Sequence, residues 1–576
     1  MRLRNNSAIT SRSRPKPADS AGAGQGERAL NSPPYLRSLL AASRPHPVAS
    51  KVRRMGGFLT ILCVFFLTLT LSQTRLIRAD VAAHGEGIEG TAGPAANLIS
   101  VTTGKFTPLN QPEIAYTATA GYMPLKEETG KLRAQMFYIA YTKGAVVVEG
   151  KAVTGLSVPD SSLVMAVQEP KRPIIFLFNG GPGAASVWLH LGTVGPQRLD
   201  VPADGTPPKA PYQVVENASS WLSAADLVFV DPVETGYSRP ADPEKAKEFF
   251  GVQEDIASVA EFVRLYLTKH QRWSSPIFLA GESYGTTRVA ALASYLQEKT
   301  GVTINGIILM STVLNFAVLS PRDSNDLPFP LFLPTYTALA RFHGKIAGDE
   351  GLLKEAESFA INEYTVALAK GDSLPESDRK AVAKKLSHFT GLSESYILES
   401  NLRVRPDRFQ KELLRDQRKL IGRFDGRLTG MVTDQVNDSA EYDPSLAGFY
   451  TAYTSAFNDY VRRVLKYDND LPYEVLSNRT RPWNFGSGGW NGYLYVGDHL
   501  RDAMTRNPNL KVLVCSGHYD LATPYFGTDY TMDHLGLPPE LRKHITQKYY
   551  PGGHMMYHVQ EARESLYKDV ESFIAK

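Results

Sequence analysis

The stretch Pro276-Ile277-Phe278-Leu279-Ala280-Gly281-Glu282-Ser283-Tyr284-Gly285 decides the fold. Its first five residues are apolar and predict a buried strand, while Thr286 to Lys299 carries apolar residues at helical spacing and predicts a helix. Between the two, Gly281 and Gly285 flank Ser283 in the pattern G-x-S-x-G, where a side chain at either glycine would obstruct a sharp turn. The serine is therefore expected on a tight turn that joins a strand to a helix.

Two further residues follow this serine in the order used by α/β-hydrolases. They are Asp520, in Gly517-His518-Tyr519-Asp520, and His554, in Gly552-Gly553-His554-Met555. A neutral serine hydroxyl is a weak nucleophile, so it needs a base to accept its proton and a carboxylate to orient that base. The pattern predicts a serine hydrolase with Ser283 as nucleophile, His554 as base and Asp520 as the orienting group.

The assignment of the base has alternatives. His554 follows the strand-like segment 547–550 and precedes the terminal helix, so it could simply cap that helix. His558 is the close rival for the catalytic role, four residues further on. His518 and His534 lie nearer in sequence to Asp520 but in segments that follow the wrong strand.

A glycine-rich turn, Asn179-Gly180-Gly181-Pro182-Gly183, follows the apolar run Ile174 to Phe178. Glycines there allow the backbone to approach a ligand and to point N–H groups at it. We expect the N–H groups of Gly181 and Tyr284 to form an oxyanion hole, the alternative being a plain tight loop.

The pattern of strands and helices predicts the fold class. Strand-like runs alternate with helical segments such as Gln253 to His270, which indicates a mostly parallel sheet covered on both faces, an α/β-hydrolase fold. Residues 94–314 and 485–576 are expected to form this core, with antiparallel strands between Ala115 and Ala140. Residues 315–484 are charged and helix-prone without a strong strand signal, and predict a helical insertion that acts as a lid or cap. An independent interaction domain is the alternative for that segment.

The first part of the chain differs in composition from the rest. Residues 1–54 predict a disordered leader, which is not translated if Met55 is the true start. Residues 55–83 have the layout of a secretory signal, because basic residues precede an uncharged apolar stretch and small residues follow it. Export to the periplasm or the outside is predicted, the alternative being an anchor that retains 55–74 in the membrane.

Charge and cysteine content exclude other classes of function. The formal net charge of +4 arises before residue 80, where 13 Lys and Arg accompany two acidic residues, leaving 50 basic and 57 acidic residues in the remainder. A mildly acidic folded part disfavours nucleic-acid binding. Of two cysteines, Cys63 lies in the signal segment, so Cys515 would be a lone buried thiol and the mature chain would have no disulfide.

These motifs together resemble the serine carboxypeptidase family over about Gln168 to Lys576. The residues that carry the resemblance are Asn179 to Gly183, Asp231 to Ser238, Gly281 to Gly285, Asp520 and Gly553 to Met555. The resemblance implies that Asn179 and Glu282 bind the free carboxylate of a peptide, which implies an exopeptidase acting at the C-terminus. Because two carboxylates repel in a poorly solvated site, Glu282 would share a proton with the substrate, which favours acidic pH.

Four positions depart from the family pattern. A common tryptophan is Leu177 here and a frequent acidic residue is Thr193, while Ala184 replaces a cysteine and His518 replaces the first acid of a Gly-Asp-x-Asp pattern. These changes bear on carboxylate recognition and leave the triad intact. The missing disulfides are compatible with a bacterial member.

The sequence thus predicts a serine carboxypeptidase-like hydrolase that acts on peptides and needs no metal and no organic cofactor. An esterase or acyltransferase of the same fold is the first alternative, since the triad does not specify the acceptor. A non-catalytic binding protein on a hydrolase fold is the second.

Overall fold

The computed structural model describes residues 99–144, 147–148, 151–152, 156–158, 171–486 and 492–576. The predicted leader, 1–54, and the predicted signal or anchor segment, 55–83, lie outside these residues. Among the helices of the described residues, none is both long enough and apolar enough to cross a bilayer.

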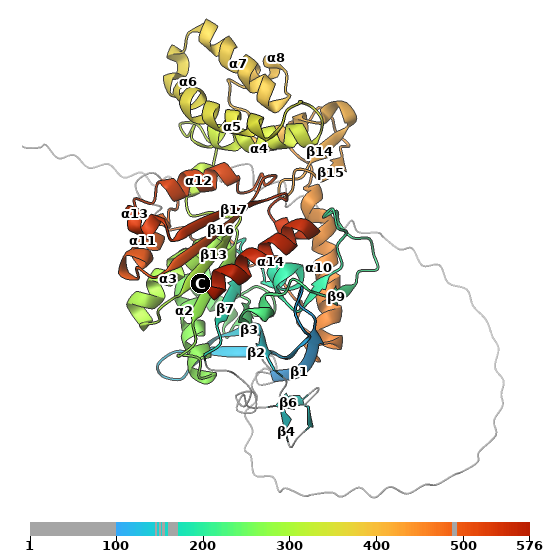
Figure 1. Ribbon diagram of the computed structural model, residues 1–576, viewed down its shortest axis with the longest axis vertical. Coiled ribbons are helices and arrows are strands. Elements are labelled where there is room, and N and C mark those ends of the chain that lie inside the picture. Colours follow the sequence, from blue (N-terminus) through green and yellow to red (C-terminus); the bar gives the residue numbers. More distant parts are fainter. Residues whose placement is uncertain (1–98, 145–146, 149–150, 153–155, 159–170, 487–491) are drawn as a thin grey trace, which may run out of the picture. The chain divides into compact units, whose positions relative to one another are not determined.

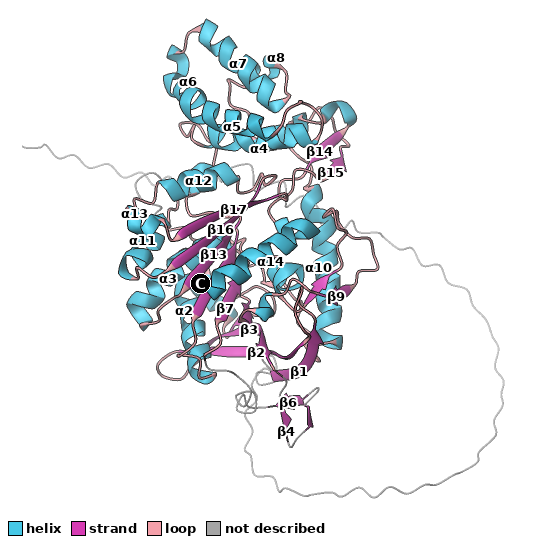
Figure 2. Ribbon diagram, viewed as in Figure 1, coloured by secondary structure: helices cyan, strands magenta, loops and turns pink. Residues whose placement is uncertain are grey.

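A large mixed sheet organises the described chain. It has 11 strands in the order β17-β16-β13-β12-β7-β10-β3-β2-β1-β6, with β11 paired to β3 (Figures 1 and 2). From β17 to β10 the neighbours are parallel, and from β10 onward they are antiparallel. The predicted α/β-hydrolase fold with its parallel central sheet is confirmed. The strands of this sheet are β1 (Ile99–Phe106), β2 (Ile114–Lys126), β3 (Leu132–Lys143), β6 (Leu156–Val158), β7 (Ile174–Phe178), β10 (Asp226–Val230), β11 (Arg239–Pro240), β12 (Ile277–Glu282), β13 (Gly306–Met310), β16 (Lys511–Gly517) and β17 (Ile545–Tyr550).

The central strands are apolar throughout because both faces of the sheet are covered. In β7 all five residues are buried: Ile174, Phe176 and Phe178 belong to the hydrophobic core on one face, and Ile175 and Leu177 to the core on the other. Such two-sided burial is why these strands read as continuous apolar runs rather than as alternating ones.

Different helices cover the two faces. The core that contains Phe176 is closed by α2 (Val252–Lys269), α3 (Tyr284–Tyr295) and α11 (Gly497–Arg506), and the opposite core by α1 (Val187–Leu189), α10 (Pro444–Arg463) and α14 (Gln560–Ala575). The stripe predicted on α2, formed by Ile256, Val259, Val263 and Leu267, is at most 2% exposed. The remaining helices of the core are α12 (Tyr525–Asp533) and α13 (Pro539–Arg542).

Between β13 and β16 the chain forms a helical layer with a hydrophobic core of its own, next to α12 (Figure 1). Its helices are α4 (Pro328–Phe342), α5 (Glu350–Phe359), α6 (Thr365–Lys370), α7 (Glu376–Thr390), α8 (Glu394–Glu399) and α9 (Pro406–Glu412). The layer ends in a short strand pair that the sequence pattern did not reveal, β14 (Lys419–Ile421) with β15 (Thr429–Met431), because three-residue strands are too short to show a period. The following helix, α10, packs into the core against the sheet instead of into this layer.

Two small strand pairs complete the description of the fold. They are β4 (Val147–Val148) with β5 (Lys151–Ala152), and β8 (Gln197–Leu199) with β9 (Val214–Glu216). Cys515, in β16, is 0% exposed, and burial raises the pKa of its thiol to about 12. Such a thiol stays protonated at neutral pH, as expected of a buried structural residue.

Candidate active site

Ser283 lies on a sharp turn between β12 and α3, as predicted. Its backbone has φ 60° and ψ −129°, a conformation that non-glycine residues rarely adopt, and its N–H donates to the carbonyl of Met310 at 3.0 Å. A Cβ placed on Gly281 would lie 2.2 Å from the carbonyl oxygen of Gly285, so the turn closes only with glycine. This strained turn holds the serine at the carboxyl end of the central strand.

The glycine-rich turn after β7 lies directly against this serine turn. A Cβ on Gly180 would be 2.4 Å from the backbone nitrogen of Tyr284, which explains the glycine. This close contact brings the backbone of Gly181 and Tyr284 to the same place in the fold, as the predicted oxyanion hole requires.

Asp520 and His554 are brought together by the loops after β16 and β17. The Nδ1 of His554 lies 2.7 Å from Oδ2 of Asp520, and the two side chains are 3% and 0% exposed. Asp520 is held in turn by Thr523, whose hydroxyl donates to Oδ2 at 2.6 Å and whose N–H donates to Oδ1 at 3.0 Å. This arrangement orients the imidazole and leaves Nε2 for proton transfer.

Burial alone would lower the pKa of His554, but the charge and hydrogen bond of Asp520, with a further contribution from Glu282, raise it above its ordinary value. Ser283 and His554 line the same pocket, although no hydrogen bond joins their side chains in the described structure. Such bonds are often long in free enzymes and tighten when substrate binds.

A loop from the helical insertion supports the loops that carry Asp520 and His554, and the sequence gave no sign of it. This loop, residues 422–428 between β14 and β15, accepts the His554 N–H on the carbonyl of Phe424 at 2.5 Å. Its Arg423 carbonyl accepts the N–H of Leu521 at 3.0 Å, and its Gly426 N–H donates to the carbonyl of Tyr519 at 3.0 Å. The hairpin loop is thus bonded on both sides of Asp520 and at His554 itself.

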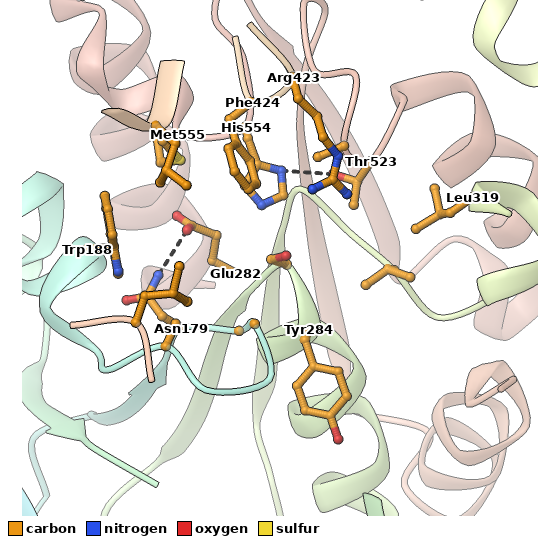
Figure 3. Close-up of a pocket in the computed structure, with 18 of the residues that line it drawn as sticks. Asn179, Trp188, Glu282, Tyr284, Leu319, Arg423, Phe424, Thr523, His554 and Met555 are labelled. Atoms are coloured by element: carbon orange, nitrogen blue, oxygen red, sulfur yellow. Dashed lines mark hydrogen bonds between the residues drawn. The ribbon is translucent and has the colours of Figure 1, made fainter. Parts of the chain in front are cut away.

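Asn179 and Glu282 form a buried pair beside the serine. The Nδ2 of Asn179 donates to Oε1 of Glu282 at 2.9 Å, and its Oδ1 accepts the N–H of Leu189 at 2.9 Å (Figure 3). Burial raises the pKa of Glu282 to about 7, against lowering effects of His554, Tyr557 and Asn179. Burial, rather than the like charge invoked from the sequence, is thus already sufficient to keep this carboxyl protonated in mildly acidic solution.

The turn that carries Asn179 is braced from behind. Arg288, on α3, donates to the Asn179 carbonyl at 2.6 Å and to Asp255 Oδ2 at 2.7 Å, and both charged side chains are at most 2% exposed. The ion pair therefore fixes α2, α3 and the glycine-rich turn to one another.

These groups surround one pocket with a volume of about 180 Å³. In Figure 3, Trp188, Met555, Asn179 and Glu282 lie on one side of His554, while Arg423, Thr523 and Leu319 lie on the other. The pocket therefore has two halves that meet at the imidazole, and one of them contains the Asn179–Glu282 pair.

The rival histidines occupy other places. His558 is buried, accepts or donates a 2.9 Å hydrogen bond with the Tyr453 hydroxyl and stacks on Phe449 at 3.8 Å, and burial lowers its pKa to about 3. His518 lines a separate cavity with Tyr549, and His534 hydrogen-bonds the carbonyl of Tyr530 through Nδ1. In the described residues no group of three or more His, Cys, Asp or Glu side chains is arranged to hold a metal ion.

Comparison with known proteins places the chain in a family. A family model described as serine carboxypeptidase matches residues 108–567. The chain belongs to the serine carboxypeptidase family. Serine carboxypeptidase-like 2 of Arabidopsis thaliana is 26% identical over 281 residues, which cover 45% of this chain and 51% of that protein. Pheromone-processing carboxypeptidase kex1 of Aspergillus niger is 30% identical over 196 residues, which cover 33% of this chain and 28% of that protein.

The chain spans about half the length, or less, of these curated relatives of the serine carboxypeptidase family. They come from a plant and a fungus, so the expectation of a bacterial member is not borne out. A solved prohormone-processing carboxypeptidase from Saccharomyces cerevisiae aligns at 16% identity and a TM-score of 0.46, covering 79% of this chain and 91% of that one. The fold assignment rests on the strand order and the family, not on that alignment.

The hydrogen bond between Asn179 and Glu282 forms despite the departures from the family pattern. Leu177 is 0% exposed in the core under β7, and Thr193 is buried in the π-helical turn His190–Val194 with no hydrogen-bond partner for its hydroxyl in the described chain. The Oε2 of Glu282 and the hydroxyl of Tyr557 are both buried, and Tyr557 contributes to lowering the pKa of this carboxyl. Asn179 binds Oε1 of Glu282 and makes no bond to Oε2.

Proposed function

We propose that this protein is a serine carboxypeptidase that removes the C-terminal residue of peptides through an acyl-enzyme. The observation that carries the proposal is the buried carboxyl of Glu282, with a pKa of about 7, in the pocket that Ser283 and His554 also line. A hydrolase that acts on neutral esters has no use for such a group, whereas a free carboxylate needs a donor beside it.

The chemistry follows from the geometry. Ser283 Oγ attacks the carbonyl carbon of the last peptide bond while Nε2 of His554 takes the hydroxyl proton. The N–H groups of Gly181 and Tyr284 stabilise the oxyanion, and the imidazolium then protonates the leaving amine. A water molecule, deprotonated by the same imidazole, hydrolyses the acyl-enzyme and restores the serine.

Glu282 and Asn179 select the end of the peptide in this scheme. Protonated Glu282 donates a hydrogen bond to the substrate carboxylate, with Asn179 holding its Oε1 in place at 2.9 Å. Ionised Glu282 would instead repel the carboxylate in a site with little solvent. Recognition is therefore tied to one proton.

We extend the proposal to the remaining parts of the chain. The helical segment 315–484 acts as a cap over the carboxyl ends of the strands. The bonds from its loop 422–428 to the loops of Asp520 and His554 support this role. Residues 55–83 direct export, which N-terminal sequencing of the mature protein would test. A mature chain beginning before Phe58 in the membrane fraction would speak for an anchor.

The activity is tested with two N-blocked peptides that differ only in a free or an amidated C-terminus, with products identified by mass spectrometry. We expect release of the last residue from the free acid and much slower release from the amide. Equal rates on both, or activity on esters only, would assign the site to a general peptidase or an esterase. Transfer of the acyl group to an added alcohol or amine in preference to water would assign it to an acyltransferase.

A further inference from the structure

Arg423 is a cation at the mouth of the catalytic pocket that the mechanism above does not use. It lies in the loop 422–428, its side chain is exposed, and it lines the pocket with Phe424 and Thr523. Its backbone is fixed at both ends, because its N–H donates to Asp443 at 3.2 Å and its carbonyl accepts from Leu521 at 3.0 Å. A rigid backbone therefore presents a solvated guanidinium to the site.

Within the described part of the chain this guanidinium has no carboxylate partner. Arg427, five residues from the start of the same loop, pairs with Asp425 at 2.5 Å, whereas the side chain of Arg423 contacts the ring of Phe424, 5.3 Å from its centroid. Its charge nevertheless acts on His554, because it opposes the effect of Asp520 and contributes a lowering of the pKa of that imidazole. An unpaired cation close to a substrate pocket is available to bind an anion.

The position of Arg423 indicates which part of a peptide it would meet. Asn179 and Glu282 lie on one side of His554 and Arg423 on the other (Figure 3). If Asn179 and Glu282 hold the C-terminal carboxylate, the last residue of the peptide occupies the first side, together with Trp188 and Met555. The preceding residue, which supplies the acyl group, then extends toward Arg423.

Apolar side chains are available on that second side. Leu319 lies there (Figure 3), and it would contact the methylene groups of a side chain whose tip reaches the guanidinium. A glutamyl side chain has this build, with an apolar stem and an anionic end.

We propose that Arg423 is a specificity-determining residue that selects an acidic side chain, glutamate above all, at the penultimate position of the substrate. The inference deepens the proposed carboxypeptidase function and rests on it for the direction in which the peptide lies. Arg423 acts on the acyl half of the substrate and takes no part in binding its C-terminal carboxylate.

The test compares N-blocked Glu-Phe with N-blocked Gln-Phe, which differ by one charge at nearly equal size. We expect kcat/KM to favour the glutamyl peptide about 5- to 10-fold at low salt, as for a partly solvated charged hydrogen bond. The preference should shrink in high salt, because solvent ions screen an exposed pair. In Arg423→Gln the ratio should approach one, and in Arg423→Glu it should invert.

The ratio is the measured quantity because removal of the cation also changes the pKa of His554 and with it both rates. Arg463→Gln is the matched control, since this arginine is exposed on α10, pairs with Asp459 at 3.3 Å and does not line the pocket. Its ratio should equal that of the wild type. A wild-type ratio of one, or a preference that survives in Arg423→Gln, overturns the proposal.

The ethyl esters of N-blocked Glu and Gln separate this inference from the proposed function. They carry the same acyl groups and no C-terminal carboxylate. If the esters show the Arg423-dependent preference while neither peptide is cleaved, the acyl-side assignment stands and the carboxypeptidase activity fails. If the wild type cleaves both peptides and shows no preference for the glutamyl peptide, only the role of Arg423 fails.

Discussion

Replacement of Glu282 by glutamine gives the sharpest test of how the site recognises a free carboxylate. The wild-type carboxyl has a pKa of about 7 because it is buried, so the protonated form persists through mildly acidic pH and is lost above neutrality. For a single group with that pKa, the protonated fraction falls about tenfold between pH 6 and pH 8. Peptide hydrolysis should therefore have an alkaline limb near pH 7, higher than the mildly acidic limb expected from the sequence.

Glutamine donates a hydrogen bond at every pH, so Glu282→Gln should lose this alkaline limb. The acid limb, which His554 sets, should move little, because Glu282 is already protonated and uncharged below about pH 7. The kcat/KM profile for an N-blocked dipeptide should therefore broaden on the alkaline side, while the profile for the matching ester, which lacks the carboxylate, should change much less.

The assay is kcat/KM from pH 4 to pH 9 for the two substrates, with Glu561→Gln on the exposed start of α14 as the control. Urea unfolding supplies a measurement independent of activity. Because the folded pKa of Glu282 lies above the ordinary value of 4.5, the wild type should lose up to about 3 kcal/mol of stability relative to Glu282→Gln as pH rises from about 4.5 to 7. An unchanged alkaline limb for the dipeptide, with no difference in pH-dependent stability, would refute the role of this carboxyl.

Three further predictions follow from the site. Ser283→Ala should lose labelling by a fluorophosphonate and about 10⁴-fold or more in kcat, and stoichiometric labelling of the variant in a mass spectrum would place the nucleophile elsewhere. His554→Ala should match that loss, whereas His558→Gln should keep its labelling with a lower Tm, because His558 packs between aromatic rings; the reverse pattern would exchange their roles. Asp255→Asn should destabilise the fold by about 3 to 5 kcal/mol in urea, since it leaves Arg288 buried without its partner, and a change below about 1 kcal/mol would contradict that picture.

The parts of the fold that local pattern determines were predictable. The serine turn was predictable because a strand, two glycines and a helix follow one another within 25 residues of Pro276. The structure forms β12, Ser283 and α3 there. The parallel centre of the sheet, covered on both faces, follows from the same alternation of apolar runs and helices, whereas the order of its strands was not predicted. The roles of Ser283, Asp520 and His554 remain predictions that the variants above test.

The parts that depend on contacts distant in sequence were not predictable. The loop 422–428 meets His554 across about 130 residues of chain, and its strands are too short to give a period. The pKa of Glu282 depends on how completely it is buried, which no motif states. Arg423 looked like one charge among many in a charged, helix-prone segment, because the absence of a partner is a property of the fold.

The bonds made by the loop 422–428 mean that the helical segment and the loops that carry Asp520 and His554 cannot diverge independently. A relative that remodels this segment to admit new substrates must still supply a carbonyl for the His554 N–H and a brace for the chain on either side of Asp520. Exchange of this helical segment between members of the family should therefore succeed only where the crossover points leave the loop with its host. The helices α5 to α8, which contribute none of these bonds, are the part in which insertions, deletions and new surfaces are free to accumulate.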